Sequence, residues 1–250
     1  MIFIGNYLYV KFKIIRKVLM VSLILFAGLK VNGQRPGDWN EIKNILSDCK
    51  GIYSGPNNNI ATSGLPDGPL LGNGNVGAVG SCDQNWARFY LTTTDFWTGD
   101  PIPEAKTDEE WIRAATDKQP AWCYYNNDPT IGVFHGKLYN AFAMIDPRGI
   151  TPEGYRTATD ADWVRLASLM GGRDTAGFEM KNKKSFGAFM GGYRNYEGKF
   201  YGLGVNGYWW STTVIFGDVM WNVVLNHKNN VVFRNYSNQM DGLYIRCLKK

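Results

Sequence analysis

Apolar residues recur every three to four positions in three segments of the chain, residues 38–50, 107–115 and 159–170. This period is typical of amphipathic helices. Each segment begins with an Asp or Thr, side chains that cap helix N-termini, and the second carries the capping-box sequence TDEE. In the third helix, which a Gly-Gly pair ends, the expected buried residues are Trp163, Leu166, Leu169 and Met170.

Shorter apolar runs predict strands. Residues 88–93 alternate like a strand, residues 121–125 form a short aromatic strand, and residues 136–144 are compatible with either a strand or a helix. The C-terminal region contains four further predicted strands, residues 208–214, 220–225, 231–235 and 242–248. The turns between the last three are short, at residues 227–230 and 238–242. Short strands with short connections indicate an antiparallel meander.

The segment from Gly191 to Thr213 mixes glycines with aromatic residues. It contains too much glycine for a helix and too many rings for a disordered linker. We predict a long ordered loop that leads into the strand at residues 208–214.

The N-terminal residues 1–33 have the pattern of a secretory signal peptide, with basic residues before an apolar run at 18–29. A tethered anchor is the alternative. Lipoprotein processing is not expected, because no cysteine ends the apolar run. The five basic residues of this segment account for the net charge of +5, so the mature part is near neutral. We therefore expect no nucleic-acid partner and no membrane span after cleavage.

All four cysteines, Cys49, Cys82, Cys123 and Cys247, follow the predicted signal. Export makes disulfides possible, and free buried thiols are the alternative. Zinc is not expected, because the sequence has no CxxC motif and neither histidine lies near a cysteine in the sequence. No metal or cofactor site is predicted.

Two further motifs have simple structural explanations. Residues 72–77 match G-x-G-x-x-G, but turn residues precede them and no helical period follows, so a tight turn is preferred to a nucleotide site. The acidic pairs Glu109/Glu110 and Asp160/Asp162 lie at predicted helix starts, where acids stabilise the helix dipole. We therefore do not assign them as catalytic carboxylates.

Residues 65–97, which include "LGNGNVGA" and "FYLTTTDFW", resemble the N-terminal sandwich of fucosidase-like secreted glycoside hydrolases. In those enzymes the catalytic carboxylates lie far downstream, in a large helical barrel for which this chain has no room. The resemblance therefore implies a sandwich edge, or a truncated relic of such a hydrolase, and contributes no catalytic residue.

A second resemblance rests on "AWCYYNNDP", "LYNAFAMIDPRGITPEGYRTATDADWVRL", "GGYRNYEGKFYGLGVNGYWWSTT" and "GLYIRCLKK", in this order. These motifs resemble the Fibrobacter succinogenes major paralogous domain, from about Gly99 to the C-terminus. That family is similar to C-type-lectin-like folds. The resemblance implies an α+β fold in which two helices flank a twisted antiparallel sheet with long irregular loops. The expected organisation is a signal peptide (1–33), an N-terminal segment (34–97) and this domain (98–250).

The chain departs from that family's pattern in one respect. Residues 150–155 read ITPEGY where the family usually has LCPEGW. Cys247 therefore lacks its usual partner, and it either stays free or pairs elsewhere, for example with Cys123. The calcium-binding tripeptide of lectins is also missing from the sequence.

We expect a binding module for a polysaccharide or another cell-surface component. Aromatic faces would stack on sugars, while Asn and Arg would bind hydroxyl groups. Strand alternation allows at most one of the two adjacent tryptophans to contact a ligand. The alternative is that the rings form the core and the Asn residues hold turns. The candidate ligand-binding residues are Tyr193, Arg194, Asn195, Tyr196, Trp209, Trp210, Trp221, Arg234, Asn235 and Asn238.

Two other classes of function are weighed against this one. A structural or adhesive surface protein would act through protein–protein contacts. An enzyme is not expected, because no nucleophile, base or carboxylate pair is assigned. In each case the signal peptide places the mature chain in the periplasm, at the cell surface or outside the cell.

Overall fold

The computed structural model describes residues 78–81, 84–87, 90–183 and 185–250, and only the backbone of residues 78–81. The predicted signal peptide, the helix at 38–50 and the glycine-rich turn at 72–77 lie outside these residues. So do Cys49 and Cys82.

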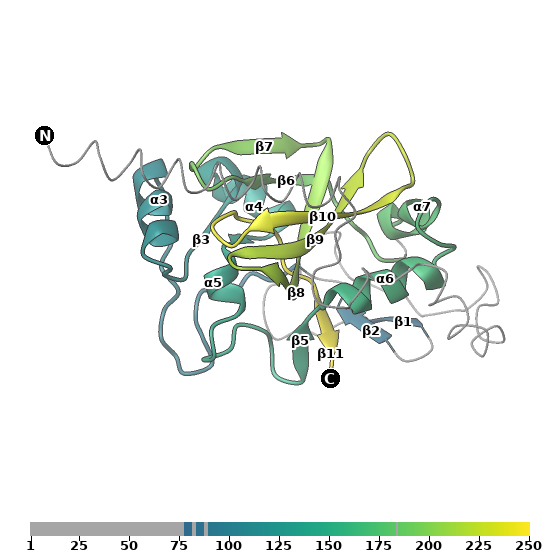
Figure 1. Cartoon of the computed structure of the whole chain (residues 1–250), viewed down its shortest axis with the longest axis horizontal. Helices are drawn as coiled ribbons and strands as arrows, with labels where there is room; N and C mark the ends of the chain where they lie inside the picture. Colours follow the sequence, from purple (N-terminus) through teal and green to yellow (C-terminus); the bar gives the residue numbers. More distant parts are fainter. Residues whose placement is uncertain (1–77, 82–83, 88–89, 184) are drawn as a thin grey trace, which may run out of the picture. The chain divides into compact units, whose positions relative to one another are not determined.

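A five-stranded sheet forms the centre of the described part, with the order β10-β9-β8-β6-β7 (Figure 1). Adjacent strands pair antiparallel, except that β6 and β8 are parallel. The first three strands of the predicted meander and the turn at 227–230 are therefore confirmed, whereas the fourth predicted strand, residues 242–248, does not join this sheet as an antiparallel neighbour. The strands are β6 (Gly191–Arg194), β7 (Phe200–Leu203), β8 (Asn206–Phe216), β9 (Val219–Asn226) and β10 (Val232–Asn238).

A second sheet has the order β1-β2-β11-β5, and β3 pairs with β4 in a third. Because β2 pairs with β11, residues 84–87 of the predicted N-terminal segment belong to the same sheet as the C-terminal strand. The strands are β1 (Ala78–Ser81), β2 (Gln84–Ala87), β3 (Trp122–Cys123), β4 (Leu138–Tyr139), β5 (Tyr155–Thr157) and β11 (Cys247–Lys249).

Five α-helices complete the described part, together with one 3-10 turn, η2 (Tyr125–Asn127). The helices are α3 (Asp108–Thr116), α4 (Pro129–His135), α5 (Ala141–Met144), α6 (Asp160–Leu169) and α7 (Ala176–Lys181). The predicted capping box is present at Thr107, and the predicted N-cap Thr159 also forms a capping box, with Asp162. The α+β class is confirmed, with more helices and sheets than the two helices and single sheet expected.

Several local predictions were wrong in detail. The predicted loop at 191–207 contains β6 and β7, which pair as an antiparallel hairpin. Its glycines interrupt the alternation of side chains from which strands are predicted. Residues 90–93 form no strand. In α6 the buried residues include Val164 and Ala167, whereas Leu169 and Met170 are only partly buried. The helices α4 and α7 were not predicted.

The segment before β11 joins the sheets. Residues 242–248 were predicted as one strand, but β11 contains only the last residues of that run. Leu243 bridges to Tyr139, and Tyr244 forms a parallel bridge with Trp209 of β8. The segment before β11 therefore lies beside β8, in the parallel direction.

Side chains cover the five-stranded sheet on both faces. On one face, Trp209 lies 6.3 Å from the Trp163 ring of α6, and Trp163 lies 4.6 Å from Trp86 of β2. We call this the α6 face. On the other face, Trp210 and Met220 pack in a core cluster with residues of α5 and β4. We call it the tyrosine face, after the residues described below.

Candidate functional site

The two adjacent tryptophans of β8 are both fully buried. Trp209 faces α6, whereas Trp210 donates its indole N–H to the Tyr139 carbonyl at 2.8 Å. The backbone carbonyl of Trp210 accepts a hydrogen bond from Trp163 Nε1 at 3.1 Å. Strand alternation does place them on opposite faces, but each face is covered at this point. Neither ring is exposed to a ligand.

Arg194 is also fully buried, between the rings of Trp111 and Phe200. Its guanidinium donates to the carbonyls of Ala105, Thr107 and Gly198 at 2.9, 2.9 and 3.0 Å. These bonds join the β6–β7 hairpin to the start of α3. The side chain therefore holds the fold together and is closed to a surface ligand.

Arg234 and Trp221 lie on the α6 face. Arg234 binds Asp160 of α6 through two hydrogen bonds of 2.9 and 2.6 Å. Its guanidinium also lies 4.3 Å from the centre of the Trp221 ring. The side chains of Arg234 and Asp160 are both largely buried. This ion pair therefore fixes α6 against the sheet.

Three further candidates lie in a turn or at a strand end that leads into one, Asn195, Tyr196 and Asn238. The Asn195 side chain accepts from the backbone N–H groups of Glu197 and Lys199. The backbone N–H groups of Tyr196 and Asn238 donate to the two carboxylate oxygens of Asp241, at 2.9 and 3.1 Å. Asp241 is buried, and burial raises its pKa to about 7, although these hydrogen bonds oppose the shift.

The tyrosine face carries a continuous row of side chains across all five strands. Phe233 of β10 pairs with Val224 of β9, and Val224 pairs with Tyr208 of β8. The Tyr208 ring lies 4.6 Å from that of Tyr193 in β6, which pairs with Tyr201 of β7 at 5.7 Å. Directly paired residues share a face. We call Tyr201, Tyr193, Tyr208 and Phe233 the aromatic row.

The rings of the aromatic row are open to solvent in part. Tyr201 is 48% exposed and Phe233 is 36% exposed, while Tyr193 and Tyr208 are partly buried. The Tyr193 ring is tilted by 31° from Tyr201 and by 49° from Tyr208, so the row is not flat. Burial, and after it the Asp241 carboxylate, raises the pKa of Tyr193 to about 12. Its hydroxyl therefore stays protonated and able to donate.

Amide side chains lie beside the aromatic row. Asn206 donates to the Tyr208 hydroxyl at 3.3 Å and accepts from Asn226 at 2.6 Å. Asn235 follows Phe233 by two residues, so it shares the face, and it is exposed. Uncharged hydrogen-bonding groups therefore lie beside the row at two places, Asn206 next to Tyr208 and Asn235 next to Phe233.

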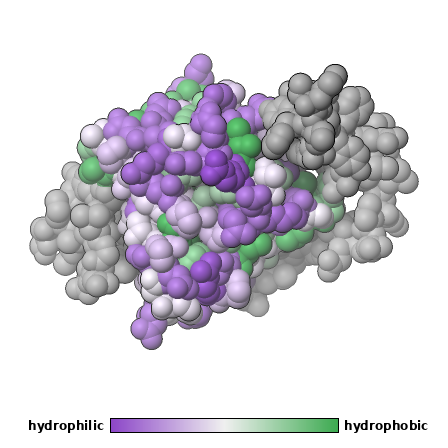
Figure 2. Space-filling model, turned by 90° about the vertical axis from the view of Figure 1, so that its left-hand side faces the viewer, coloured by the Kyte–Doolittle hydropathy of each residue, from purple (hydrophilic) through white to green (hydrophobic). Residues whose placement is uncertain are grey.

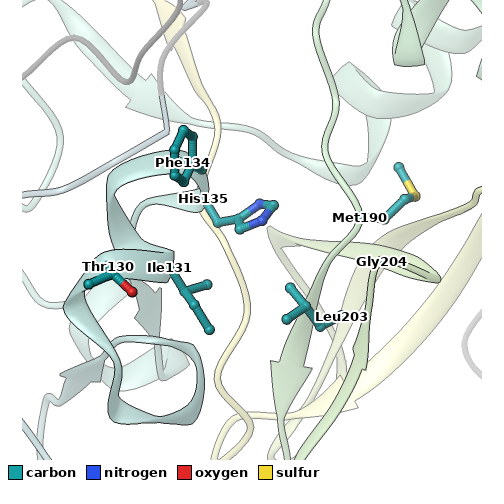
Figure 3. Close-up of a pocket in the computed structure, with 7 residues that line it drawn as sticks. All are labelled: Thr130, Ile131, Phe134, His135, Met190, Leu203 and Gly204. Carbon is teal, nitrogen blue, oxygen red and sulfur yellow. The ribbon is translucent and has the colours of Figure 1, made fainter.

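A separate hollow lies between α4 and the β7 end of the sheet (Figure 3). It has a volume of about 410 Å³ and is lined by Thr130, Ile131, Phe134, His135, Met190, Leu203 and Gly204. The position of α4 depends on Gly132, since a Cβ there would lie 2.2 Å from the Tyr124 ring. Figure 3 shows the His135 ring directed from α4 into the space toward Met190 and Gly204.

On the face shown in Figure 2, hydrophilic residues dominate and hydrophobic residues form small, separated areas. Within the described ranges, no three His, Cys, Asp or Glu residues are grouped as metal ligands. No helix of those ranges is both long and apolar enough to cross a membrane.

The sequence profile of the Fibrobacter succinogenes major domain matches residues 79–249. The chain belongs to this family. The match begins at Val79, about twenty residues before Gly99, so the family domain includes β2 as the sheet pairing does. No curated protein and no solved structure matches the chain.

Within this family domain, the structure brings two of the ten predicted residues to the aromatic row or its border, Tyr193 and Asn235. Sequence reasoning missed Tyr201, Tyr208, Phe233 and Asn206. The alternation in residues 200–203 and the pairing of β8 with β9 could have shown them. The glycines at 198, 202 and 204 masked that signal.

The two cysteines of the described part, Cys123 and Cys247, are free and buried. The possible disulfide between them is therefore not formed. Burial raises the pKa of each thiol to about 12, which keeps it protonated and unreactive.

Proposed function

We propose that this domain is a secreted, non-catalytic binding module, and that the aromatic row binds a neutral carbohydrate. The observation that carries the proposal is the row itself, four partly open rings on four of the five strands, beside uncharged amides. Aromatic rings present an apolar surface with a polar tip, which suits the mixed surface of a sugar. Amides and phenols supply both donors and acceptors.

The tilt between the rings narrows the ligand class. A flat crystalline surface would need coplanar rings, whereas the rings here differ by 31° and 49°. A single soluble chain can follow such a surface because its units rotate relative to one another. The proposal is therefore a soluble polysaccharide or oligosaccharide, bound in the manner of a lectin-like module at the cell surface or in the periplasm.

The experiment that tests this proposal is binding of the purified chain to a glycan array and to soluble polysaccharides. Tyr201→Ala and Phe233→Ala should each weaken binding about tenfold, because each removes an exposed ring of the row. Phe178→Ala is the matched control, since Phe178 of α7 is 63% exposed outside the row.

Two results would reject the proposal. One is glycan binding that both row variants leave unchanged. The other is the absence of binding to any glycan by a folded protein, and retention on other cell-surface proteins would then favour the adhesive alternative. Hydrolysis of a chromogenic fucoside would instead revive the enzyme alternative.

A further inference from the structure

Among the tryptophans whose side chains the structure describes, Trp97 alone is exposed. Its side chain is 56% exposed, whereas Trp209 and Trp210 are fully buried. A tryptophan left in water forgoes much of the stabilisation that burial of its large ring would give. An exposed tryptophan that is also held in a fixed orientation is typical of a ligand contact.

The backbone of residues 149–151 holds the Trp97 ring in a fixed orientation. The indole N–H donates to the Thr151 carbonyl, and the Trp97 backbone N–H donates to the Gly149 carbonyl at 3.1 Å. Gly149 has a φ angle of 78°, and a Cβ there would lie between 2.9 and 3.2 Å from three atoms at or beside the fusion of the two indole rings. These atoms lie inside the outline of the indole, so the backbone covers one ring face and the opposite face is the open one.

Charged and hydroxyl groups border the ring. Asp100 and Thr98 belong to the same exposed turn as Trp97, and Arg148 directly precedes Gly149. The Asp100 carboxylate accepts from Thr98 at 2.8 Å and from Arg148 at 3.4 Å, in both cases through Oδ2. The hydrogen bonds from Thr98 and then Arg148 lower the pKa of Asp100. Its carboxylate is therefore ionised at neutral pH, and Oδ1 is available to accept from a ligand.

These surroundings narrow the class of ligand. A protein partner would cover an apolar patch around an aromatic anchor, but the neighbours of Trp97 are polar. Lys250, whose Nζ lies 5.1 Å from the ring centre, is exposed like Thr98 and Asp100. A sugar matches both features, because its C–H face covers an aromatic ring while its hydroxyls donate to a carboxylate and accept from a cation.

We infer that Trp97 is a second carbohydrate contact, on which one pyranose ring stacks with its hydroxyls at Asp100 and Arg148. This contact extends the carbohydrate binding proposed above, but it shares no residue with the aromatic row. Either contact can therefore fail without the other. Two separate contacts would let one module bind two places on a soluble polysaccharide.

Two-dimensional NMR spectra of the full chain test the contact through the indole N–H signal of Trp97. The probes are the methyl glycosides of glucose, galactose, mannose and fucose, and methoxycyclohexane is the matched ring without free hydroxyls. At least one glycoside should shift the Trp97 signal to saturation, whereas methoxycyclohexane should leave it in place. The inference is wrong if no glycoside shifts the signal, or if methoxycyclohexane shifts it equally.

Titration calorimetry with the glycoside that shifts the signal tests the residues, in a chain that carries Tyr201→Ala to weaken the aromatic row. In that background Trp97→Ala should weaken binding about tenfold. Asp100→Asn should weaken it about threefold, because an amide oxygen accepts less strongly than a carboxylate. Phe134→Ala is the control, since Phe134 is 59% exposed on α4, and it should bind normally. Unchanged binding by a folded Trp97→Ala variant, or an equal loss in Phe134→Ala, overturns the inference.

Discussion

Two neighbouring positions on the tyrosine face use their aromatic residues in opposite ways. Trp210 and Tyr208 lie two residues apart on β8 and point to the same side. Trp210 is fully buried, with its indole N–H bound to the Tyr139 carbonyl, whereas Tyr208 is partly open. Residues of β4 and α5 cover the first position completely, whereas Tyr208 packs against the same core cluster and leaves part of its side chain open. The packing of β4 and α5 on the sheet therefore decides how exposed each of these two side chains is, since both belong to the same face of β8.

The comparison predicts that the covered position carries the larger share of stability. Trp210→Ala should lower the free energy of unfolding by about 3–5 kcal/mol, because it leaves a cavity in the core cluster. Urea denaturation measures this. A loss below about 1 kcal/mol would mean that the β4–α5 layer does not pack on Trp210 as described.

Arg194 is the second test of the covered region. Arg194→Met should cost about 3 kcal/mol in unfolding free energy, because it leaves the carbonyls of Ala105, Thr107 and Gly198 without their donor. Lys199→Ala is the matched control, since the exposed Lys199 shares only the Asp108 carboxylate with Arg194. Denaturation curves that coincide for the two variants would contradict the structural role of Arg194.

Local signals in the sequence predicted the parts of the fold that depend on neighbours in the chain. The capping box at Thr107, the N-cap Thr159 and the hairpin turn at 227–230 were predicted because their partners lie within a few residues. The burial of Trp209 and Trp210 was not predicted, because the groups that cover these rings are distant in the sequence. Trp163 is 47 residues from Trp210, and Tyr139 is 71 residues from it.

The candidate site was less predictable than the fold for the same reason. The aromatic row exists only after β6 has paired with β7 and lies parallel to β8. Gly192 and Gly202 have positive φ angles of 72° and 81°, and these interrupt the alternation from which a strand is predicted. Several tryptophans and arginines were predicted to bind a ligand. Of these, Trp209, Trp210 and Arg194 are fully buried in the structure, and the Arg234 side chain is largely buried.

Asp241 links the β6–β7 turn to the end of β10 through its carboxylate, and its titration makes the stability of the fold pH-dependent. Its folded pKa of about 7 is above the ordinary value of 3.8, so the folded state binds the proton more tightly. Its contribution to stability is therefore fully present below about pH 4 and is lost as the pH rises through about 7. Asp241→Asn should remove this slope.

The measurement for Asp241 is the difference in unfolding free energy between wild type and variant at pH 5 and at pH 8. We expect wild type to lose stability relative to the variant as the pH rises. All other titrating groups are shared, so they cancel in the difference. A constant difference, or one of opposite sign, would show that the hydrogen bonds from Tyr196 and Asn238 outweigh burial.

The smallest effect on stability is expected at the open end of the aromatic row. Tyr201→Ala should change the free energy of unfolding by less than about 1 kcal/mol, because the ring is 48% exposed on the edge strand β7. The same variant should lose most of the glycan binding proposed for the row. Trp210→Ala should show the reverse balance, with a large loss of stability and, at temperatures where it stays folded, intact binding. If Tyr201→Ala unfolds as readily as Trp210→Ala, the row is part of the core and the distinction between the two positions disappears.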